Sequence, residues 1–204
     1  MLNFTDRCYT LSVNITQLIK EGTYPRGYRK CTLQYSLNPA VAYAINVLSE
    51  PDIKDRVLDP FCGSGTILIE RQLLKSCVCV GVDIDPRAIE CAGENIRAAG
   101  VEVELQHGDI MTKKFPEGYF TKIISNLPYG IHSGTREKNV RLYQFTADKM
   151  INWLRVDGKA VLVTNAKSLL RNTFAHNPDW ELLSETPFQT GGLNISVFVF
   201  SRIR

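Results

Sequence analysis

The chain has 204 residues, of which 44% are hydrophobic and 22% charged, and its formal net charge is +3. This length suits one domain with one well-buried core, and no apolar run approaches the roughly 20 residues that a membrane-spanning helix needs. The first residues lack the basic-then-apolar order of a secretory signal, so we expect a cytoplasmic protein without a membrane partner. The six cysteines include no Cys-x-x-Cys pair, and only three histidines accompany them, which argues against a metal site.

Charge is unevenly distributed along the chain. Residues 1–50 carry 5 basic and 3 acidic groups, residues 51–130 carry 9 and 12, and residues 131–204 carry 10 and 6. An enzyme that acts on nucleic acid would place phosphate-binding Lys and Arg side chains on its substrate side. Ordinary surface charge explains the same numbers, so both interpretations stay open.

Residues 1–50 are expected to form an appendage that packs on the core. Residues 9–15 alternate like a strand, residues 22–30 form a basic turn region, and Asn38-Pro39 opens an apolar helix that ends near residue 48.

Residues 51–204 predict a doubly wound, Rossmann-like α/β domain. Short β-branched runs alternate with stretches of helical period, which is typical of a parallel sheet flanked by helices. We expect strands at 56–59, 77–82, 102–106, 121–125 and 159–165, and helices near 65–75, 86–99, 140–155 and 167–174. Cys77 and Cys79 alternate in one of these strands and are expected to be reduced and buried. Two later runs, 180–185 and 195–201, predict antiparallel strands at one sheet edge.

The loop after the first predicted strand has the composition of a cofactor cradle. Residues 59–66 read Asp-Pro-Phe-Cys-Gly-Ser-Gly-Thr and turn into a helix, whose N–H groups and positive dipole end would face a ligand. Gly63 and Gly65 allow a ligand to approach the backbone closely. A dinucleotide fingerprint needs a third glycine where Leu68 stands, which argues against a nicotinamide cofactor. A tight turn without a ligand is the alternative for this loop alone.

Two further acidic residues follow the next two predicted strands. Asp83 lies eighteen residues after Gly65, where a carboxylate can accept the hydroxyls of a ribose. Capping of the following helix is the alternative role for Asp83 and the expected role for Asp85. Asp109 either accepts the amino hydrogens of an adenine or occupies a turn. Because the carboxyl ends of parallel strands meet at one edge, we expect Asp59, Asp83 and Asp109 to line one crevice.

Residues 126–130, Asn-Leu-Pro-Tyr-Gly, follow the fourth predicted strand. An exocyclic amine of a base is a poor nucleophile because its lone pair is delocalised into the ring. The Asn126 side-chain oxygen and the Leu127 carbonyl can accept its two N–H groups and aim the lone pair at an electrophilic methyl. Pro128 fixes the turn, and Tyr129 offers an aromatic face for the base. Asn126 cannot take a proton at neutral pH, so it would orient the amine rather than act as a base. In isolation, a plain Asn-x-Pro turn is the alternative.

Residues 59–70, 81–86 and 126–130, with the basic stretch 24–30 upstream, resemble the THUMP-associated RNA methylases. The resemblance runs through nearly the whole chain. It implies a class I methyltransferase fold with a seven-stranded, mostly parallel sheet whose last strand is antiparallel, S-adenosyl-L-methionine as cofactor, and methylation of guanosine N2 in tRNA. By matching motifs, the cofactor would be held by Asp59, Phe61, Cys62, Gly63, Ser64, Gly65, Thr66, Asp83, Ile84, Gly108, Asp109, Ile110 and Asn126. The target base would be held by Asn126, Leu127, Pro128 and Tyr129.

Two departures qualify the resemblance. Leu127 replaces the first of two prolines in the familiar clamp, although only its carbonyl is needed. The THUMP module that usually precedes this domain is missing from the chain, so RNA docking would fall to a partner, to a segment of a longer protein or to the basic flanks. The candidates on those flanks are Arg26, Arg29, Lys30, Arg136, Lys138, Arg141, Lys167 and Arg171. Access to the base requires a single-stranded loop or extrusion of the nucleotide.

Other functions fit the same motifs. The clamp would also serve adenine N6 in DNA or ribosomal RNA, or a protein glutamine amide. A non-catalytic binding module that keeps the fold is a further alternative, against which intact Asn126 and Tyr129 argue. The sequence leaves the oligomeric state open.

Overall fold

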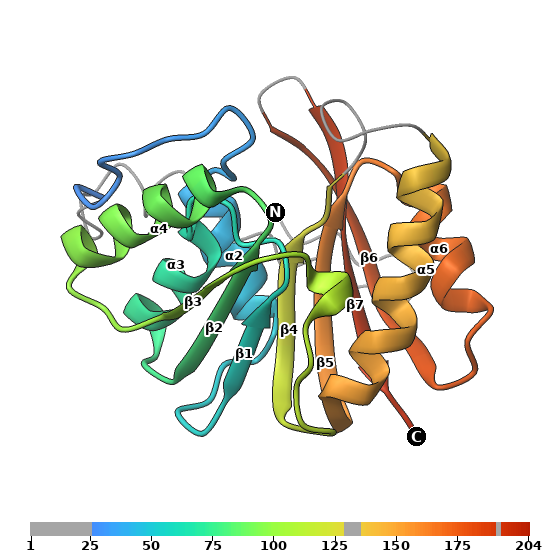
Figure 1. Cartoon of the computed structure of the whole chain (residues 1–204). Coiled ribbons are helices and arrows are strands. Elements are labelled where there is room, and N and C mark those ends of the chain that lie inside the picture. Colours follow the sequence, from blue (N-terminus) through green and yellow to red (C-terminus); the bar gives the residue numbers. More distant parts are fainter. Residues whose placement is uncertain (1–25, 129–135, 191–192) are drawn as a thin grey trace, which may run out of the picture.

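A computed structural model describes residues 26–128, 136–190 and 193–204, which form one sheet with helices on both faces (Figure 1). Within these residues the sheet has seven strands: β1 (Arg56–Asp59), β2 (Val78–Asp83), β3 (Glu104–His107), β4 (Phe120–Asn126), β5 (Leu154–Thr164), β6 (Trp180–Thr190) and β7 (Leu193–Arg202). Their order is β3-β2-β1-β4-β5-β7-β6. Strands β1 to β5 pair in parallel, whereas β7 pairs antiparallel with both β5 and β6. The expected fold, a mostly parallel sheet with an antiparallel last strand, is confirmed.

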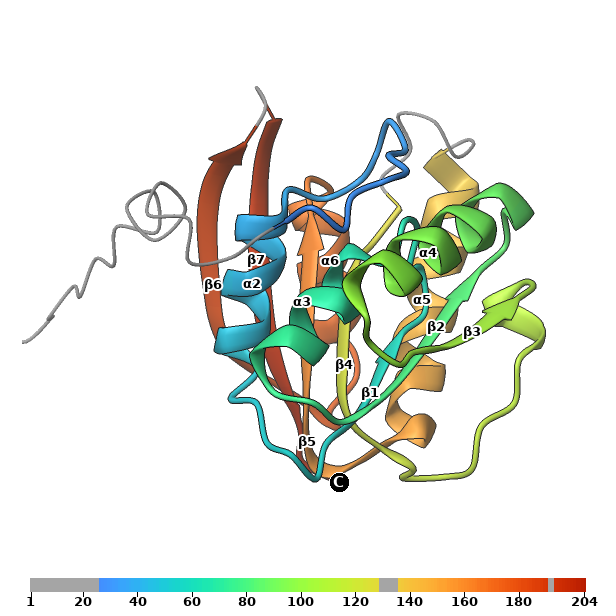
Figure 2. The ribbon, with the colours of Figure 1, turned by 90° about the vertical axis from the view of Figure 1, so that its left-hand side faces the viewer.

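Five α-helices and one 3-10 helix accompany the sheet in the described part of the chain. They are α2 (Pro39–Leu48), α3 (Thr66–Leu74), α4 (Pro86–Ala99), η1 (Ile110–Thr112), α5 (Arg136–Trp153) and α6 (Lys167–Ala175). Helices α2, α3 and α4 cover one face of the sheet, and α5 and α6 cover the other (Figures 1 and 2). None of the helices that the structure describes is long and apolar enough to cross a membrane.

Successive side chains of a strand point to opposite faces of the sheet, so they pack against different helices. On β1, Val57 packs with residues of α2 and α3, while its neighbour Leu58 packs with residues of α5 and α6. On β4, Ile124 likewise packs on the side of α2 and α3, and its neighbour Ile123 packs on the side of α5 and α6. Both faces are apolar because both are covered by helices, which is the arrangement expected of a parallel sheet.

Two helices, α2 and α4, begin at capping residues that can be recognised in the sequence. Asn38 caps α2 by accepting from the N–H of Ala40, and Asp85 caps α4 by accepting from the N–H of Arg87. A proline follows each cap at the first helical position, where its missing N–H costs no hydrogen bond. The predicted helices 39–48 and 86–99 therefore match the observed ones, and the expected capping role of Asp85 is confirmed.

Some predicted strand boundaries are wrong at the far side of the sheet. Strand β5 begins at Leu154 rather than residue 159, because the turn-like Asp157-Gly158 pair lies within an irregular part of the β4–β5 pairing. Strand β6 continues to Thr190 rather than residue 185, and Pro187 lies within it. Proline is tolerated there because β6 is an edge strand, so one side of its backbone needs no partner.

The expected appendage is described only from residue 26. The strand predicted at 9–15 lies outside the described residues. Residues 26–37, which we call the strap, run across α3 and α4 before the chain enters α2 (Figures 1 and 2). The strap therefore approaches the edge of the sheet at which β1 and β2 end.

Candidate functional site

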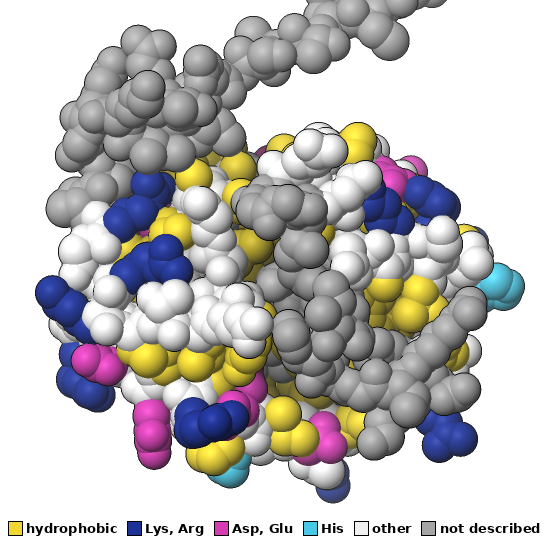
Figure 3. All heavy atoms as spheres, turned by 90° about the horizontal axis from the view of Figure 1, so that it is seen from above, with side chains coloured by type: hydrophobic (Ala, Val, Ile, Leu, Met, Phe, Trp, Pro, Cys, Tyr) yellow, Lys and Arg dark blue, Asp and Glu magenta, His cyan; other side chains and the backbone are white. Residues whose placement is uncertain are grey.

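The polar residues predicted at the strand ends do meet at one edge of the sheet. Asp59 is the last residue of β1, Asp83 the last of β2 and Asn126 the last of β4, while Asp109 follows β3 by two residues. Figure 3 looks down on this edge, and among the side chains that it colours most of the charged ones lie toward the outline, with hydrophobic ones between them.

The loop between β1 and α3 forms a tight turn around two glycines. Gly63 and Gly65 have φ angles of 53° and 79°, which residues with a Cβ seldom adopt. A Cβ at Gly65 would also lie 3.2 Å from Cβ of Ala92. No side chain caps α3, so N–H groups at its N-terminus stay available to a ligand. We call residues 61–66 the glycine turn.

Asp59 is a buried carboxyl group with one free oxygen. Its Oδ1 accepts from the Ser125 hydroxyl at 2.6 Å and from the N–H of Phe61 at 3.1 Å, while Oδ2 is buried with no partner among the described residues. Burial raises the pKa of Asp59 to about 7, against the two hydrogen bonds, which lower it. Buried polar atoms are nearly always hydrogen-bonded, so Oδ2 fits a ligand that carries N–H groups.

Asp83 ties the glycine turn to the end of β2. Its Oδ2 accepts from the N–H of Gly63 at 2.8 Å, and its Oδ1 accepts from the N–H of Asp85 at 3.0 Å. Each oxygen keeps a lone pair for a further donor. Asp83 is half-buried and is not the cap of α4, a role that Asp85 fills.

The segment after β3 is built around a turn. Asp109 caps η1 by accepting from the N–H of Met111 at 2.8 Å, which is the turn role considered above for this residue. Gly108, with φ of 143°, donates its N–H to the carbonyl of Asp83. Ile110 is buried in the core, whereas the Ile84 side chain is 65% exposed. The carboxylate of Asp109 keeps its second oxygen for another donor.

A small hollow, with a cavity volume of about 40 Å³, lies between the glycine turn and the tip of β4. It is lined by Phe61, Cys62, Gly63, Ser64, Thr66, Ile67 and Asn126, together with Tyr35, Ser36 and Leu37 of the strap. Six of the predicted site residues therefore share one hollow. The other predicted site residues that the structure describes lie along the same edge but do not line the hollow: Asp59, Gly65, Asp83, Ile84, Gly108, Asp109, Ile110, Leu127 and Pro128.

Asn126, at the tip of β4, is one of the residues that line this hollow. Oδ1 of Asn126 is buried and has no partner among the described residues. The tip is anchored directly after it, because Leu127 is buried and donates its N–H to the carbonyl of Val163 at 2.9 Å. Pro128 follows, half-buried, and Tyr129 lies outside the described residues. The arrangement leaves an anchored acceptor that a bound amine can use.

Four residues near the hollow carry no sequence signal that identifies them in advance. Tyr35, Ser36 and Leu37 precede α2 in a stretch without periodicity, and only the helix start at Asn38 indicates that a turn lies there. Burial and then the charges of Asp83 and Asp85 raise the pKa of Tyr35, which places its ring near the strand ends. Ser125 is hidden in an apolar strand, and only its hydrogen bond to Asp59 shows its importance.

Several basic side chains proposed for RNA docking have partners within the chain. Arg26 pairs with Glu70 at 3.2 Å, Arg171 pairs with Glu185 at 2.7 Å, and Lys167 donates to Asn194 at 2.8 Å. The side chains of Arg136 and Lys138 are not among those described. Arg29 is half-buried, and Lys30 and Arg141 are exposed.

The doubly wound sheet, the glycine turn after β1 and the Asn-Leu-Pro tip after β4 define a Rossmann-like class I methyltransferase domain. Residues 26–194 match the model of a family described as the RMKL-like methyltransferase domain. The chain belongs to this family.

Curated relatives and a solved structure share much of the chain. It is 29% identical over 191 residues to the tRNA (guanine(6)-N2)-methyltransferase of Thermus thermophilus, which covers 91% of this chain and 56% of the relative. It is 39% identical over 111 residues to the tRNA (guanine(10)-N2)-dimethyltransferase of Methanothermobacter thermautotrophicus, covering 53% and 32%. The crystal structure of TrmN from Thermus thermophilus superposes with a TM-score of 0.78 at 28% identity, over 87% of this chain and 53% of that one. The chain thus spans about half or less of the length of these proteins.

Proposed function

We propose that this chain is the catalytic domain of an S-adenosyl-L-methionine-dependent N-methyltransferase that acts on the exocyclic N2 amine of a guanosine in tRNA. The observation that carries the proposal is the shared hollow: residues of the glycine turn line the same space as Asn126, whose Oδ1 is buried without a partner among the described residues. The two curated relatives described above are both named as tRNA guanine-N2 enzymes, which supports the choice of substrate.

The residues of the cradle fit the proposed cofactor. S-adenosyl-L-methionine carries an ammonium group, a carboxylate, a ribose and an adenine, and it supplies an electrophilic methyl group on a sulfonium. The unpartnered Oδ2 of Asp59 suits the ammonium group, and the uncapped start of α3 suits an anion. The remaining lone pairs of Asp83 suit the ribose hydroxyls, and the free oxygen of Asp109 suits the adenine amine.

The tip of β4 suits the acceptor amine. Asn126 would accept one N–H of the guanosine amine through Oδ1, and the carbonyl of Leu127 would accept the other. Both contacts hold the lone pair of the nitrogen toward the methyl donor, and Pro128 and Tyr129 complete the clamp around the base. Asn126 takes up no proton, so the methylated cationic amine loses its proton to water after transfer.

RNA docking beyond the clamp would be supplied by a partner or by a further segment of a longer protein. Arg26, Lys167 and Arg171 already have partners within the chain, which leaves them less available to phosphates. The relatives are also about twice as long as the matched region or longer, so they have additional chain for this purpose.

The test is incubation of the purified protein with methyl-labelled S-adenosyl-L-methionine and total tRNA, followed by nuclease digestion and identification of the labelled nucleoside. We expect label in N2-methylguanosine. Label in N6-methyladenosine, or in a nuclease-resistant protein fraction, would replace the proposed acceptor by one of the other planar amines. Cofactor binding without transfer to any acceptor, also when a full-length relative provides RNA docking, would support a non-catalytic module instead.

A further inference from the structure

The strap forms one wall of the hollow, although it is far in sequence from most of the predicted motif residues. It supplies Tyr35, Ser36 and Leu37 to the lining. The hydroxyl groups of Ser36 and Ser64 lie 2.7 Å apart, which joins the end of the strap to the glycine turn. A ring carbon of Tyr35 lies 3.8 Å from the position that a Cβ of Gly63 would take. The shape of the hollow therefore depends on where the strap lies.

The beginning of the strap is fixed to α3 by a buried carboxylate. Oε1 of Glu70, which is fully buried, accepts from the Tyr28 hydroxyl at 2.6 Å and from Nε of Arg26 at 3.2 Å. Burial and the bond to Glu70 raise the pKa of Tyr28, so its hydroxyl stays a donor at physiological pH.

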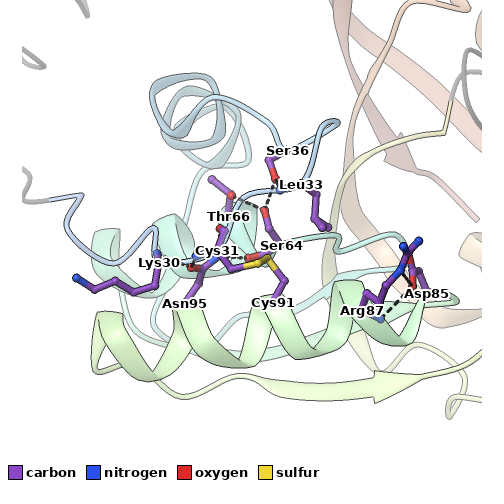
Figure 4. The surroundings of a disulfide bond; sticks show 10 residues. All are labelled: Lys30, Cys31, Leu33, Ser36, Ser64, Thr66, Asp85, Arg87, Cys91 and Asn95. Carbon is purple, nitrogen blue, oxygen red and sulfur yellow. Dashed lines mark hydrogen bonds and ion pairs between the residues drawn. A yellow bond between two sulfur atoms is a disulfide. The ribbon is translucent and has the colours of Figure 1, made fainter.

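One buried amide fixes the middle of the strap. Oδ1 of Asn95 on α4 accepts from the N–H groups of Lys30 and Cys31, each at 2.9 Å. Its Nδ2 donates to the carbonyl of Cys31 at 2.9 Å and to the carbonyl of Ser64 at 3.0 Å (Figure 4). All the hydrogen-bonding capacity of the amide is used. Asn95 thus joins the strap and the glycine turn through a single side chain.

A disulfide connects the same point of the strap to α4. Cys31 is bonded to Cys91, with their Cα atoms 5.3 Å apart, and Cys91 lies one turn before Asn95 on the helix (Figure 4). Cys31 is half-buried, and Cys91 is buried. Among the described cysteines that remain, Cys62, Cys77 and Cys79 are free.

We propose that Cys31, Cys91 and Asn95 are positioning residues of the cofactor site, and that affinity for the cofactor depends on the redox state of the cysteine pair. The inference rests on the proposed function only for the identity of the ligand. When a dithiol such as dithiothreitol donates two electrons and two protons, the S–S bond breaks, two thiols form and the reductant becomes a disulfide. The strap then keeps its hydrogen bonds to Asn95 and Glu70 but loses its covalent attachment. Reduction would therefore leave the wall in place for only a fraction of the time.

This physical picture predicts a graded effect. Affinity falls in proportion to the fraction of molecules whose strap is in place. Because the hydrogen bonds of Asn95 persist, we expect about a three- to ten-fold rise in the dissociation constant of S-adenosylhomocysteine on reduction, rather than complete loss. Disulfides of cytoplasmic proteins are usually transient or redox-sensing, which agrees with such a role in a protein that the sequence predicts to be cytoplasmic.

The experiment compares binding of S-adenosylhomocysteine by calorimetry to oxidised and dithiothreitol-treated protein, well below the unfolding temperature. The Cys31→Ser variant should bind like reduced wild-type protein and should not respond to dithiothreitol. The matched control Cys77→Ser removes a thiol away from the strap, so it should respond like wild type. Asn95→Ala should weaken binding further in the reduced state. Equal dissociation constants for both redox states of a folded protein would overturn the proposal.

A second measurement separates this inference from the proposed function. Hydrogen exchange of the amides of residues 30–37 should quicken on reduction, while exchange in α5 and α6 should not change. If the ligand binds in neither redox state but this local exchange still responds, the proposed cofactor is wrong and the attachment of the strap stands. Peptide mapping of unreduced protein that finds no Cys31–Cys91 linkage would contradict the inference directly.

Discussion

Two aspartates four residues apart, Asp55 and Asp59, lie at opposite ends of β1 and have opposite surroundings. Asp55 accepts from Arg71 at 2.9 Å, from Thr121 at 2.7 Å and from the N–H of Asp52 at 2.8 Å, so both of its oxygens have partners. Asp59 has donors on one oxygen only, and the other is buried without a partner among the described residues. The carboxylate of Asp55 is therefore fully hydrogen-bonded within the chain, whereas that of Asp59 keeps one oxygen for a donor from a ligand.

The same contrast extends across the neighbouring strand. Thr121 near the start of β4 is hydrogen-bonded to Asp55, whereas Oδ1 of Asn126 at its end is buried without a partner among the described residues. A buried polar group without a partner costs folding free energy. The unpartnered oxygens of Asp59 and Asn126 therefore suit this edge to binding a ligand, whereas the carboxylate of Asp55 at the opposite edge is used within the fold.

The largest expected effect comes from removing the free oxygen of the tip. Asn126→Ala should reduce methyl transfer about 100- to 1,000-fold, as does the loss of a preorganised polar group in other active sites. Its dissociation constant for the cofactor should stay within about three-fold of wild type, because the side chain acts on the acceptor amine. Asn152→Ala, an exposed position on α5, is the matched control. Loss of cofactor binding by folded Asn126→Ala would count against the assigned role.

The opposite edge should respond in stability instead of binding. Asp55→Asn leaves the buried guanidinium of Arg71 without its carboxylate, so we expect a loss of about 3–5 kcal/mol in the free energy of unfolding, measured in urea. Cofactor affinity of the folded variant should be unchanged. Asp148→Asn, at an exposed position, should alter neither quantity. A loss below about 1 kcal/mol would show that the ion pair of Asp55 and Arg71 contributes little to stability, which would contradict the stabilising role assigned to this edge of the sheet.

Asp83 is both a proposed contact of the cofactor and a hydrogen-bond partner of the glycine turn. Asp83→Ala removes the acceptor proposed for the ribose hydroxyls and also the bond to the N–H of Gly63, so cofactor binding should weaken by about 1–3 kcal/mol. Transfer at saturating cofactor should recover most of its rate. A normal dissociation constant measured by calorimetry would move the ribose contact elsewhere, with Asp85 as the next candidate.

The smallest effect is the pH dependence of stability that Asp59 contributes. Its folded pKa of about 7 is above the ordinary value of about 3.9, so between these values the folded protein binds more protons than the unfolded chain. The free energy of unfolding should therefore fall as pH rises from 5 to 7, by at most about 1.4 kcal/mol per pH unit. In Asp59→Asn, the free energy of unfolding measured by urea titration should change less with pH than in the wild type. An unchanged slope would place the proton on another group.

Local signals explain how much of the fold the sequence predicts. The capping pair Asp85-Pro86 and the glycine at 100 define α4 within a few residues of its ends, and each depends only on neighbouring residues. The glycine turn and the Asn-Leu-Pro tip are also contiguous, so their positions follow once the strands are recognised. Their meeting in one hollow follows from the common direction of parallel strands.

Contacts between distant residues were not predictable in this way. Ser125 bonds to Asp59 across 66 positions, and Cys31 bonds to Cys91 across 60. No periodicity or motif marks these partners, because each depends on how the strands and the strap pack. Asp109 illustrates the reverse case, since its sequence context fits both a turn and a ligand contact, and the structure shows that the turn uses one of its oxygens.

The most direct test of the account is a crystal structure of the protein with S-adenosylhomocysteine. We predict that the amino group of the ligand lies within hydrogen-bonding distance of Oδ2 of Asp59 and that its sulfur faces the hollow beside Oδ1 of Asn126. A ligand bound elsewhere, with both of these oxygens still lacking a donor, would contradict it.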